Sequence, residues 1–152
     1  MEAFLKEFRP VDGIKSVSPG QTIEFAAKTA GEIHAGDIIA FWGDLGAGKT
    51  HFIKGMASFW GISEDEVISP TFGIVKEYAG RDMSLYHFDF YRILDSKELD
   101  TIGFRDYIAD TEAVTAVEWP ERAPDLFDIY TAAVVIKHES VSSRSIEVYR
   151  KI

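Results

Sequence analysis

Residues 43–50, GDLGAGKT, have the types and spacing of a loop that binds nucleotide phosphates. They match the pattern G-x-x-x-x-G-K-[ST] at each fixed position. Small residues let backbone N–H groups converge on phosphate oxygens, and a helix that starts there adds partial positive charge. In this pattern the Lys49 ammonium reaches the β- and γ-phosphates and the Thr50 hydroxyl binds Mg²⁺. The predicted phosphate-binding residues are Gly43, Asp44, Leu45, Gly46, Ala47, Gly48, Lys49 and Thr50.

The alternative for this loop is a glycine-rich turn that binds no ligand. A match by chance arises in roughly one in two hundred chains of this length, given ordinary residue usage. The context also fits, since an apolar run (38–42) precedes the loop and a helical pattern (52–60) follows it. GTPases usually carry an N-K-x-D element for guanine, which this sequence lacks. Asp100–Gly103 matches the D-x-x-G pattern of GTPases, but it follows polar residues rather than an apolar strand. ATP is therefore favoured over GTP.

Two carboxylates could complete the chemistry of a bound nucleotide. Phosphoryl transfer needs a second ligand for Mg²⁺ and a group that orients the attacking water. Asp89 and Glu118 stand at or near the ends of predicted core strands, where ligands bind in open α/β sheets. The alternative for each is a solvated residue at a strand end, and the sequence does not rank the two acids. His87 shares a strand face with Asp89 and is interpreted as structural.

Other residues near these acids have less specific roles. Trp119 follows Glu118 and could shield the site, although core packing is the usual role of a single tryptophan. Residues 69–72, SPTF, form either an ordinary turn or a loop that senses the nucleotide. An arginine would stabilise the charge of the transition state. The candidates, each more typical of a surface residue when taken singly, are Arg92, Arg105, Arg122 and Arg144.

The elements that must position these residues alternate between strands and helices. Residues 3–8 could form an edge strand. Ser18 can cap a helix whose apolar stripe extends to Ile33. A buried strand over 38–42 leads into the phosphate loop, and the helix after the loop continues to Trp60.

The second half of the chain is richer in strands, with one or two short helices between residues 95 and 110. The predicted strands are 72–78, 84–91, 113–119, 131–138 and 144–150, the last two joined as a hairpin. Alternation early and a hairpin late favour a mixed sheet. We therefore predict one α/β domain over residues 1–152, P-loop NTPase-like, with a mixed, largely parallel central sheet, antiparallel strands and helices on both faces.

The composition disfavours several other classes. A chain of 152 residues has the size of one domain, and the absence of cysteine excludes disulfides and fits a reducing cytosol. The first residues carry acids and lack a long apolar core, so we expect no signal peptide. No apolar stretch reaches the about 18 residues that span a membrane. The net charge of −9 would repel a phosphate backbone, so we expect any nucleic acid to be reached through a partner.

Four blocks in this order resemble the TsaE (YjeE-type) family of bacterial P-loop ATPases. They are GDLGAGKT (43–50), SPTF (69–72), HFDFYR (87–92) and VEWPER (117–122). The resemblance implies a cytoplasmic, Mg²⁺-dependent ATPase that is required for N6-threonylcarbamoyladenosine in tRNA. It also implies action on a complex of TsaD and TsaB, which binds the tRNA. Contact with tRNA is then indirect, and neither DNA nor a membrane is an expected partner.

The resemblance further implies catalytic and metal-binding roles. Thr50 and Glu118 are expected at Mg²⁺. Lys49 and the 44–49 backbone are expected at the phosphates of ATP. Asp89 is expected at the nucleotide or the attacking water, so that Asp89, Glu118 and Lys49 form the catalytic set.

Around this set, the resemblance implies that Trp119 shapes the site and that the 69–72 loop acts as a switch. Arg144 is expected to contact the nucleotide, and Pro19–Thr22 is expected near the base. The sequence departs from the family at His51, where members commonly have a second threonine. We expect this change to alter contacts around the metal ligands rather than abolish metal binding.

Two other functions remain open at this point. A small-molecule kinase would share the phosphate loop, but it should have a lid with arginines, and residues 92–110 contain only Arg92 and Arg105. A nucleotide-gated binding module, with incidental hydrolysis, is the third possibility. Residues 1–13 match the family poorly and are interpreted as an extension, with a possible added strand.

Overall fold

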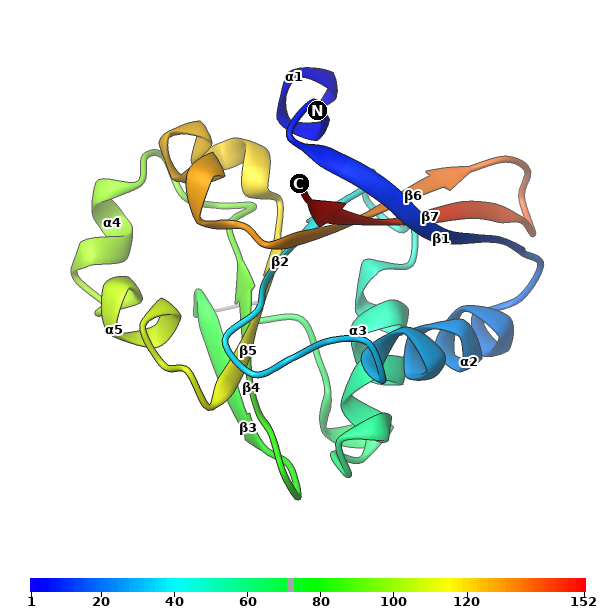
Figure 1. The fold of residues 1–152 in the computed structure, drawn as a ribbon, viewed down its shortest axis with the longest axis horizontal. Coiled ribbons are helices and arrows are strands. Elements are labelled where there is room, and N and C mark those ends of the chain that lie inside the picture. Colours follow the sequence, from blue (N-terminus) through cyan, green and yellow to red (C-terminus); the bar gives the residue numbers. More distant parts are fainter. Residues whose placement is uncertain (71–72) are drawn as a thin grey trace.

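One mixed sheet of seven strands runs through the computed structural model, which describes residues 1–70 and 73–152. In spatial order the strands are β1-β7-β6-β2-β5-β4-β3 (Figure 1). Their bounds are β1 (Phe8–Ser16), β2 (Ile38–Trp42), β3 (Val75–Ala79), β4 (Ser84–Asp89), β5 (Ala113–Glu118), β6 (Ala132–His138) and β7 (Arg144–Lys151). The central β6, β2, β5 and β4 are parallel, and β3, β7 and β1 pair antiparallel. The predicted mixed, largely parallel sheet is confirmed.

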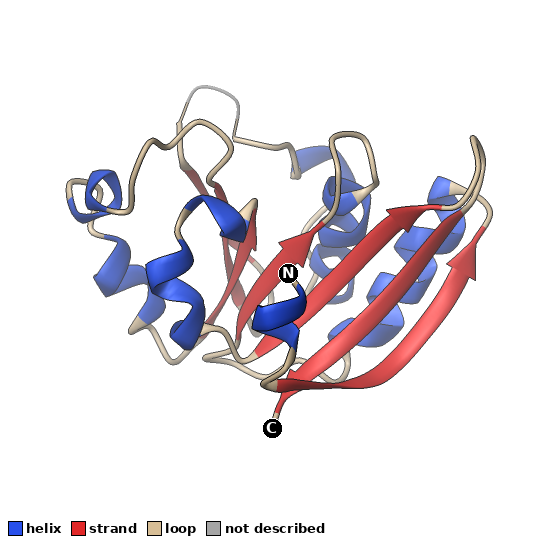
Figure 2. Cartoon of the chain, turned by 90° about the horizontal axis from the view of Figure 1, so that it is seen from above, coloured by secondary structure: helices blue, strands red, loops and turns tan. Residues whose placement is uncertain are grey.

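Helices cover both faces of this sheet, as Figures 1 and 2 show. On one face α2 (Pro19–Ala30) and α3 (Lys49–Phe59) pack against each other. The short 3-10 helix η1 (Glu64–Glu66) follows α3. The other face is covered by α1 (Glu2–Leu5), α4 (Lys97–Asp100), α5 (Phe104–Ile108) and the 3-10 helices η2 (Pro120–Arg122) and η3 (Pro124–Ile129). None of the helices in the described part of the chain combines the length and apolar character that a membrane crossing requires.

The central strand β2 supplies side chains to both cores. All five of its residues are buried, which suits a strand covered on both faces. Because side chains alternate, Ile39 and Phe41 point into the core beneath α2 and α3. Ile38, Ala40 and Trp42 point into the core on the opposite face. The loop that leaves β2 therefore starts from a rigid position at the carboxyl edge of the sheet.

The helix α2 begins at a side-chain cap, and the helix α3 packs closely against it. The Ser18 hydroxyl accepts a hydrogen bond from the backbone N–H of Gln21 at 3.1 Å, and the Gln21 side chain accepts one from Val17 N–H at 2.9 Å. The predicted start of this helix is thus confirmed. In α3, a Cβ on Gly55 would lie 2.3 Å from the carbonyl oxygen of Ile23 in α2. Only glycine allows the backbones to come this close, and the contact sets how closely α2 and α3 pack.

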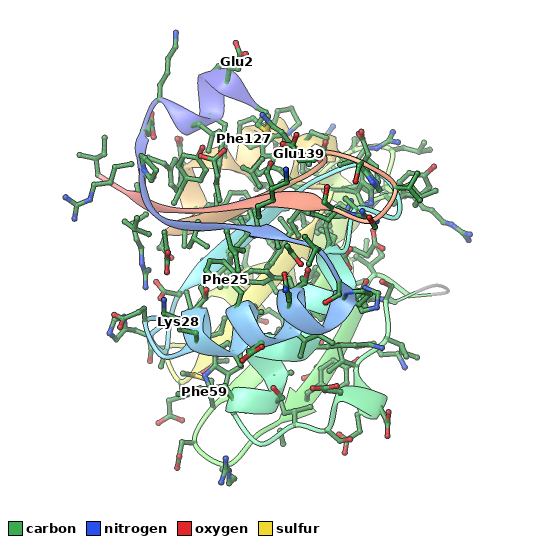
Figure 3. The ribbon with its side chains drawn as sticks, turned by 90° about the vertical axis from the view of Figure 1, so that its right-hand side faces the viewer. Glu2, Phe25, Lys28, Phe59, Phe127 and Glu139 are labelled. Carbon is green, nitrogen blue, oxygen red and sulfur yellow. The ribbon has the colours of Figure 1, made fainter. Side chains whose placement is uncertain are left out.

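The N-terminal segment differs from the prediction of a strand over residues 3–8, because residues 3–7 form part of helix α1 and a turn. Phe4 and Phe8 are four residues apart, and their rings stack with centroids 4.5 Å apart. Phe4 also packs against Trp42, at 5.2 Å, and against Phe127, at 5.1 Å. Figure 3 shows Phe127 beneath α1. A helical turn lets both phenylalanines reach this aromatic core, and the edge strand β1 begins only at Phe8.

Two strands end earlier than predicted. The β4 strand ends at Asp89 because the Asp89 carboxylate accepts a hydrogen bond from Tyr91 N–H, at 2.9 Å, which turns the chain. The β5 strand ends at Glu118, since Trp119 has a φ of 59° that no strand accommodates. Both carboxylates therefore stand at the last residue of their strands.

Two further details depart from the sequence pattern. Phe59 belongs to the helical pattern of residues 52–60 but is 51% exposed, because it lies at the last turn of α3, beside Gly31 at the end of α2. The strand predicted over 72–78 is β3 (Val75–Ala79), and residue 72 lies outside the described residues.

Candidate nucleotide site

Residues 43–50 connect the end of β2 to the start of α3. Gly46 and Gly48 have φ angles of 76° and 112°, in the left-handed region that favours glycine. Gly43 is needed for a different reason, because a Cβ there would lie 2.9 Å from the carbonyl oxygen of Ile136. The loop ends where Lys49 begins α3, and the first N–H groups of a helix have no partner within it. This backbone has the form that a phosphate cradle requires.

A cavity of about 660 Å³ opens beside the loop, a volume typical of small-molecule sites. Its lining brings residues 45–50 together with the predicted Asp89, Glu118 and Trp119. A second cavity, of about 250 Å³, adjoins residues 46–48 and His51. The rest of its lining comes from residues 16–19, Thr22, Val141, Ser142 and Arg144. Pro19 and Thr22, expected near the base, thus lie beside the phosphate loop. Gly43 and Asp44 line neither cavity.

Lys49 is almost fully buried although it carries a charge, with 5% of the residue exposed. Its ammonium donates a hydrogen bond to the carbonyl oxygen of Gly43 and lies 3.8 Å from the centroid of the Trp119 ring. Burial lowers the pKa of the Lys49 ammonium, and the negative charges of Glu118, Glu121 and Asp89 oppose that shift. The side chain is therefore held inside the cavity by neutral groups and stabilised by nearby acids.

The two predicted acids face the phosphate loop for a geometric reason. Asp89 and Glu118 are register partners on the parallel strands β4 and β5. Val114 and Ala116 precede Glu118 at alternate positions and point into the core beneath α2 and α3. Leu85 stands in the same relation to Asp89. Strand periodicity therefore puts both carboxylates on the face where α3 begins.

Glu118 is buried and joins three distant parts of the chain. Its Oε2 lies 2.6 Å from Nε2 of His87 and accepts a hydrogen bond from the Ser69 hydroxyl at 3.4 Å. The Ser69 hydroxyl is in turn 2.6 Å from the hydroxyl of Thr50. A chain of polar contacts, His87–Glu118–Ser69–Thr50, thus links the strand ends to the start of α3. The two residues expected at Mg²⁺ are brought to the same place.

Asp89 has a different environment from its register partner. It is half-buried, and its Oδ1 accepts the hydrogen bond from Tyr91 N–H. Burial raises the pKa of the Asp89 carboxyl, and the charge of Glu118 adds to the effect, while the Tyr91 hydrogen bond opposes it. A carboxylate with a raised pKa is a better proton acceptor. The structure thus separates two acids that the sequence could not rank.

Trp119 is the only non-glycine residue with positive φ in the described ranges 1–70 and 73–152. A bulky residue in this region is strained, and such strain persists where neighbours fix the conformation. Its ring lies 4.8 Å from that of Tyr91, on one side of the cavity, and the Lys49 ammonium approaches the same ring. The turn at Trp119 thereby places its indole at the wall of the cavity, where the residue also packs against the core cluster that contains Phe88 and Val117.

The candidate arginines are spread over different places. Arg92 lines the main cavity. The guanidinium of Arg122 lies 5.4 Å from the Tyr91 ring, and the Arg105 side chain is 82% exposed. Arg144 lines only the second cavity, and its Nε donates a hydrogen bond to the carbonyl oxygen of Ala47 at 3.1 Å. Of the switch-like 69–72 loop, Ser69 and Pro70 line the main cavity, and Thr71 and Phe72 lie outside the described residues.

Some lining residues had no signal in the sequence. Ile93 and Glu98 come from the 92–110 stretch, in which the sequence analysis predicted short helices but no residue of the site other than Arg92 and Arg105 as candidate arginines. The Glu98 carboxylate accepts hydrogen bonds from the N–H groups of Leu94, at 2.5 Å, and Asp95, at 3.2 Å. These bonds hold residues 94–98 in a local turn after β4. A pattern of acids in a polar stretch does not reveal such a role, because the contact depends on how that stretch folds back.

The residues present fit a magnesium ion that is bound together with nucleotide phosphates. No group of three or more His, Asp or Glu side chains that could hold a metal occurs in the part of the chain that the structure describes. Magnesium at phosphates, however, usually takes only one or two ligands from the protein. Thr50 and Glu118 supply a hydroxyl and a carboxylate of the expected kinds.

Comparisons with known proteins agree in both sequence and structure. Residues 16–146 match the family model described as threonylcarbamoyl adenosine biosynthesis protein TsaE. The chain is 38% identical over 132 residues to the tRNA threonylcarbamoyladenosine biosynthesis protein TsaE of Bacillus subtilis, covering 87% of this chain and 81% of that protein. It is also 38% identical over 129 residues to the protein of the same name from Synechocystis, covering 83% of this chain and 74% of that one.

A solved structure extends the likeness to the fold. The crystal structure of Bacillus subtilis YdiB aligns with a TM-score of 0.76 at 30% identity. The alignment covers 95% of this chain and 88% of YdiB.

Proposed function

The chain belongs to the TsaE family of threonylcarbamoyl adenosine biosynthesis proteins, and from this premise we propose that it binds and hydrolyses ATP with Mg²⁺. The single observation that carries the proposal is the meeting of Lys49, Thr50, Asp89 and Glu118 at one cavity of about 660 Å³. These residues lie up to 69 positions apart in the sequence, yet each has the chemistry that phosphoryl transfer requires.

The parts of the site have separate tasks in this proposal. The backbone N–H groups of residues 44–49 bind the phosphates, and Lys49 neutralises their charge. Thr50 and Glu118 hold the metal ion. When bound, ATP supplies the phosphoryl group that is transferred to water, and Mg²⁺ offsets the charge on its oxygens. Trp119 covers one side of the cavity and limits the access of bulk water.

Asp89 is the residue that we assign to the attacking water. Its burial and the neighbouring Glu118 raise the pKa of its carboxyl, which favours the uptake of a proton. Glu118 is held by His87 and Ser69 and stays in place as the metal ligand. This division of roles is supported by the different burial and hydrogen bonding of the two acids.

The biological setting follows from the family. We propose that the protein acts in the cytoplasm on a complex of TsaD and TsaB, and that ATP hydrolysis resets this complex between cycles of tRNA modification. The net charge of −9 supports contact with tRNA through the partners rather than directly. Tight binding of tRNA by this chain alone, at physiological salt, would contradict this arrangement.

The test is to measure ATP turnover by the protein alone and then with TsaD, TsaB and tRNA. We expect Mg²⁺-dependent turnover that rises strongly only when the partners are present. A Lys49→Ala variant in the same mixture is the control for contaminating ATPases and should abolish the rise. Equal turnover with and without the partners would contradict the proposed setting, and ATP-dependent phosphorylation of a metabolite would favour a kinase.

A further inference from the structure

His87 is fully buried in the middle of the site but does not line its cavity. The residue is 0% exposed in β4, beneath the face where α3 begins. Its Nε2 lies 2.6 Å from Oε2 of Glu118. The sequence suggested only a structural role for it. At this distance the buried imidazole can determine how the Glu118 carboxylate is oriented.

The hydrogen bonding of the ring identifies the donor. Nδ1 of His87 is buried and has no hydrogen-bond partner among the described residues. A buried N–H without an acceptor is costly, so the neutral ring is best satisfied with its proton on Nε2 and a bare lone pair on Nδ1. His87 then donates to the Glu118 carboxylate. The opposite tautomer would set a lone pair against a carboxylate oxygen and would bury an unpaired donor.

This hydrogen bond fixes one end of the polar chain that leads to Thr50. Oε2 also accepts a hydrogen bond from the Ser69 hydroxyl, at the longer distance of 3.4 Å, and Ser69 contacts Thr50 at 2.6 Å. Ser69 is half-buried, whereas His87 lies within a strand between β3 and β5. The rigid end of the chain is therefore His87, and the carboxylate keeps its orientation through the imidazole.

We propose that His87 is a positioning residue that holds the Glu118 carboxylate where it can bind Mg²⁺. This inference rests on the proposed function and assigns His87 to the metal-dependent part of nucleotide binding. Hydrogen bonds to metal ligands orient them, and their loss typically lowers metal affinity by about 10- to 100-fold. A simple filler of the core would instead affect stability and leave the metal dependence unchanged.

The experiment measures the affinity for ADP by calorimetry, with EDTA and across a titration of Mg²⁺. In His87→Leu we expect the Mg²⁺ concentration for half-maximal tightening of ADP binding to rise by about 10- to 100-fold. Affinity in EDTA should stay within about twofold, because the phosphate loop is untouched. His87→Gln, whose amide N–H can reach toward Glu118, should recover most of the metal dependence. If His87→Leu does not fold, His87→Asn is used, since its shorter amide does not reach the carboxylate.

The matched control is Leu85→Ala, on the same strand and the same face. Leu85 is also 0% exposed, so the variant loses stability through a cavity but keeps the His87–Glu118 contact. Its Mg²⁺ midpoint should equal that of the wild type. In a double-mutant cycle, His87→Leu should add little to the loss already caused by Glu118→Gln, because both remove one interaction.

Each outcome has one interpretation. A wild-type midpoint in the His87 variants, or a shift no larger than that of Leu85→Ala, would overturn the positioning role alone. Additive losses in the double-mutant cycle would also overturn it, since His87 would then act elsewhere. A wild-type protein whose ADP affinity does not depend on Mg²⁺ would overturn the proposed metal site together with this inference.

Discussion

Two buried carboxylates stand at opposite edges of the parallel strands, and their surroundings differ. Asp37 precedes β2 at the amino edge and is 8% exposed, whereas Glu118 ends β5 at the carboxyl edge and is 3% exposed. Arg150 binds Oδ1 of Asp37 at 2.8 Å, Thr131 binds the same oxygen at 2.7 Å, and His34 N–H binds Oδ2 at 2.8 Å. Both oxygens of Asp37 are thus bound from fixed parts of the fold.

Among the described residues, Glu118 instead contacts the His87 imidazole and the Ser69 hydroxyl, and its side chain lines a cavity. Burying a carboxylate is costly unless a charge or several hydrogen bonds compensate. At Asp37 a guanidinium does so, and the acid ties β2, β6 and β7 together. At Glu118 the compensation is partial, which leaves the acid able to gain a further partner from a cation. The same side-chain chemistry therefore serves stability at one edge and the proposed function at the other.

The largest expected effect is that of Lys49→Met, which tests the functional edge. Turnover should fall by about 10²- to 10³-fold, as when a preorganised group that stabilises transition-state charge is lost. Stability should stay equal or rise, because burial lowers the pKa of the Lys49 ammonium and so opposes its charge. ATPase assays check the predicted loss of turnover, and thermal denaturation checks the predicted stability. A large loss of stability with retained turnover would mean that Lys49, at the carboxyl edge, serves the fold rather than the proposed function.

At the amino edge, Asp37→Asn should lower the free energy of unfolding by about 2–3 kcal/mol, since it removes charged hydrogen bonds to a buried site. The affinity for ADP, measured by calorimetry on the folded protein, should stay within about twofold of the wild type. The control is Asp12→Asn, because Asp12 pairs with Lys28 in a bridge whose side chains are 43% and 75% exposed. Such a surface pair contributes less than about 1 kcal/mol. Equal losses in the two variants would mean that Asp37 has no special place in the fold.

The acid dependence of stability gives a finer test of the same residue. Burial alone would raise the pKa of Asp37, but the hydrogen bonds from Arg150, His34 and Thr131 outweigh it and hold the pKa below the ordinary 3.8. Ionised Asp37 therefore stabilises the fold above that value, and its contribution is lost as the pH falls through the lower folded pKa. In chemical denaturation, the stability gap between the wild type and Asp37→Asn should be full near pH 7 and shrink below pH ~4. A gap that stays constant across this range would contradict an ionised Asp37.

The contrast between these carboxylates also marks what the sequence could predict. The phosphate loop has a dense local pattern, and strand ends place Asp89 and Glu118 near it, so the candidate site was found from residue types and order. The ranking of the two acids depends on His87 and Ser69, which are 31 and 49 positions from Glu118. Asp37 was not singled out at all, because its partner Arg150 lies 113 positions away. Register and burial decide such contacts, and neither can be inferred from spacing along the chain.

The N-terminal helix was missed for a related reason. AFLKEF is a short, mostly apolar segment that fits a strand, but it also puts Phe4 and Phe8 at helical spacing. The aromatic core around Trp42 decides between the two readings, since only the helical turn brings both rings to it. The structure of a short apolar segment that fits either a helix or a strand is decided by the residues that it packs against.

The smallest expected effect concerns Arg144, which contacts the phosphate loop but lines only the second cavity. The resemblance implied a direct contact with the nucleotide, whereas the guanidinium binds the carbonyl oxygen of Ala47 and three carbonyls of the hairpin tip, those of Ser140, Val141 and Ser143. Because the described peptide bonds include no cis bond, the N–H of Gly48 points away from Arg144. Arg144 thereby orients a donor of the phosphate loop.

If Arg144 acts through this peptide, Arg144→Met should weaken ADP binding by about 1 kcal/mol, or about fivefold, the contribution of one ordinary hydrogen bond. Arg144→Lys should recover part of the loss. A direct bond from the guanidinium to a phosphate would cost about 1.5–3 kcal/mol instead, as hydrogen bonds to charged groups do. Calorimetry separates these ranges, and the amide NMR signal of Gly48 in the nucleotide-free protein gives a second measure. That signal should shift in Arg144→Met if the arginine orients the loop. An unshifted signal with the larger loss of affinity would instead make Arg144 a residue of the nucleotide site itself.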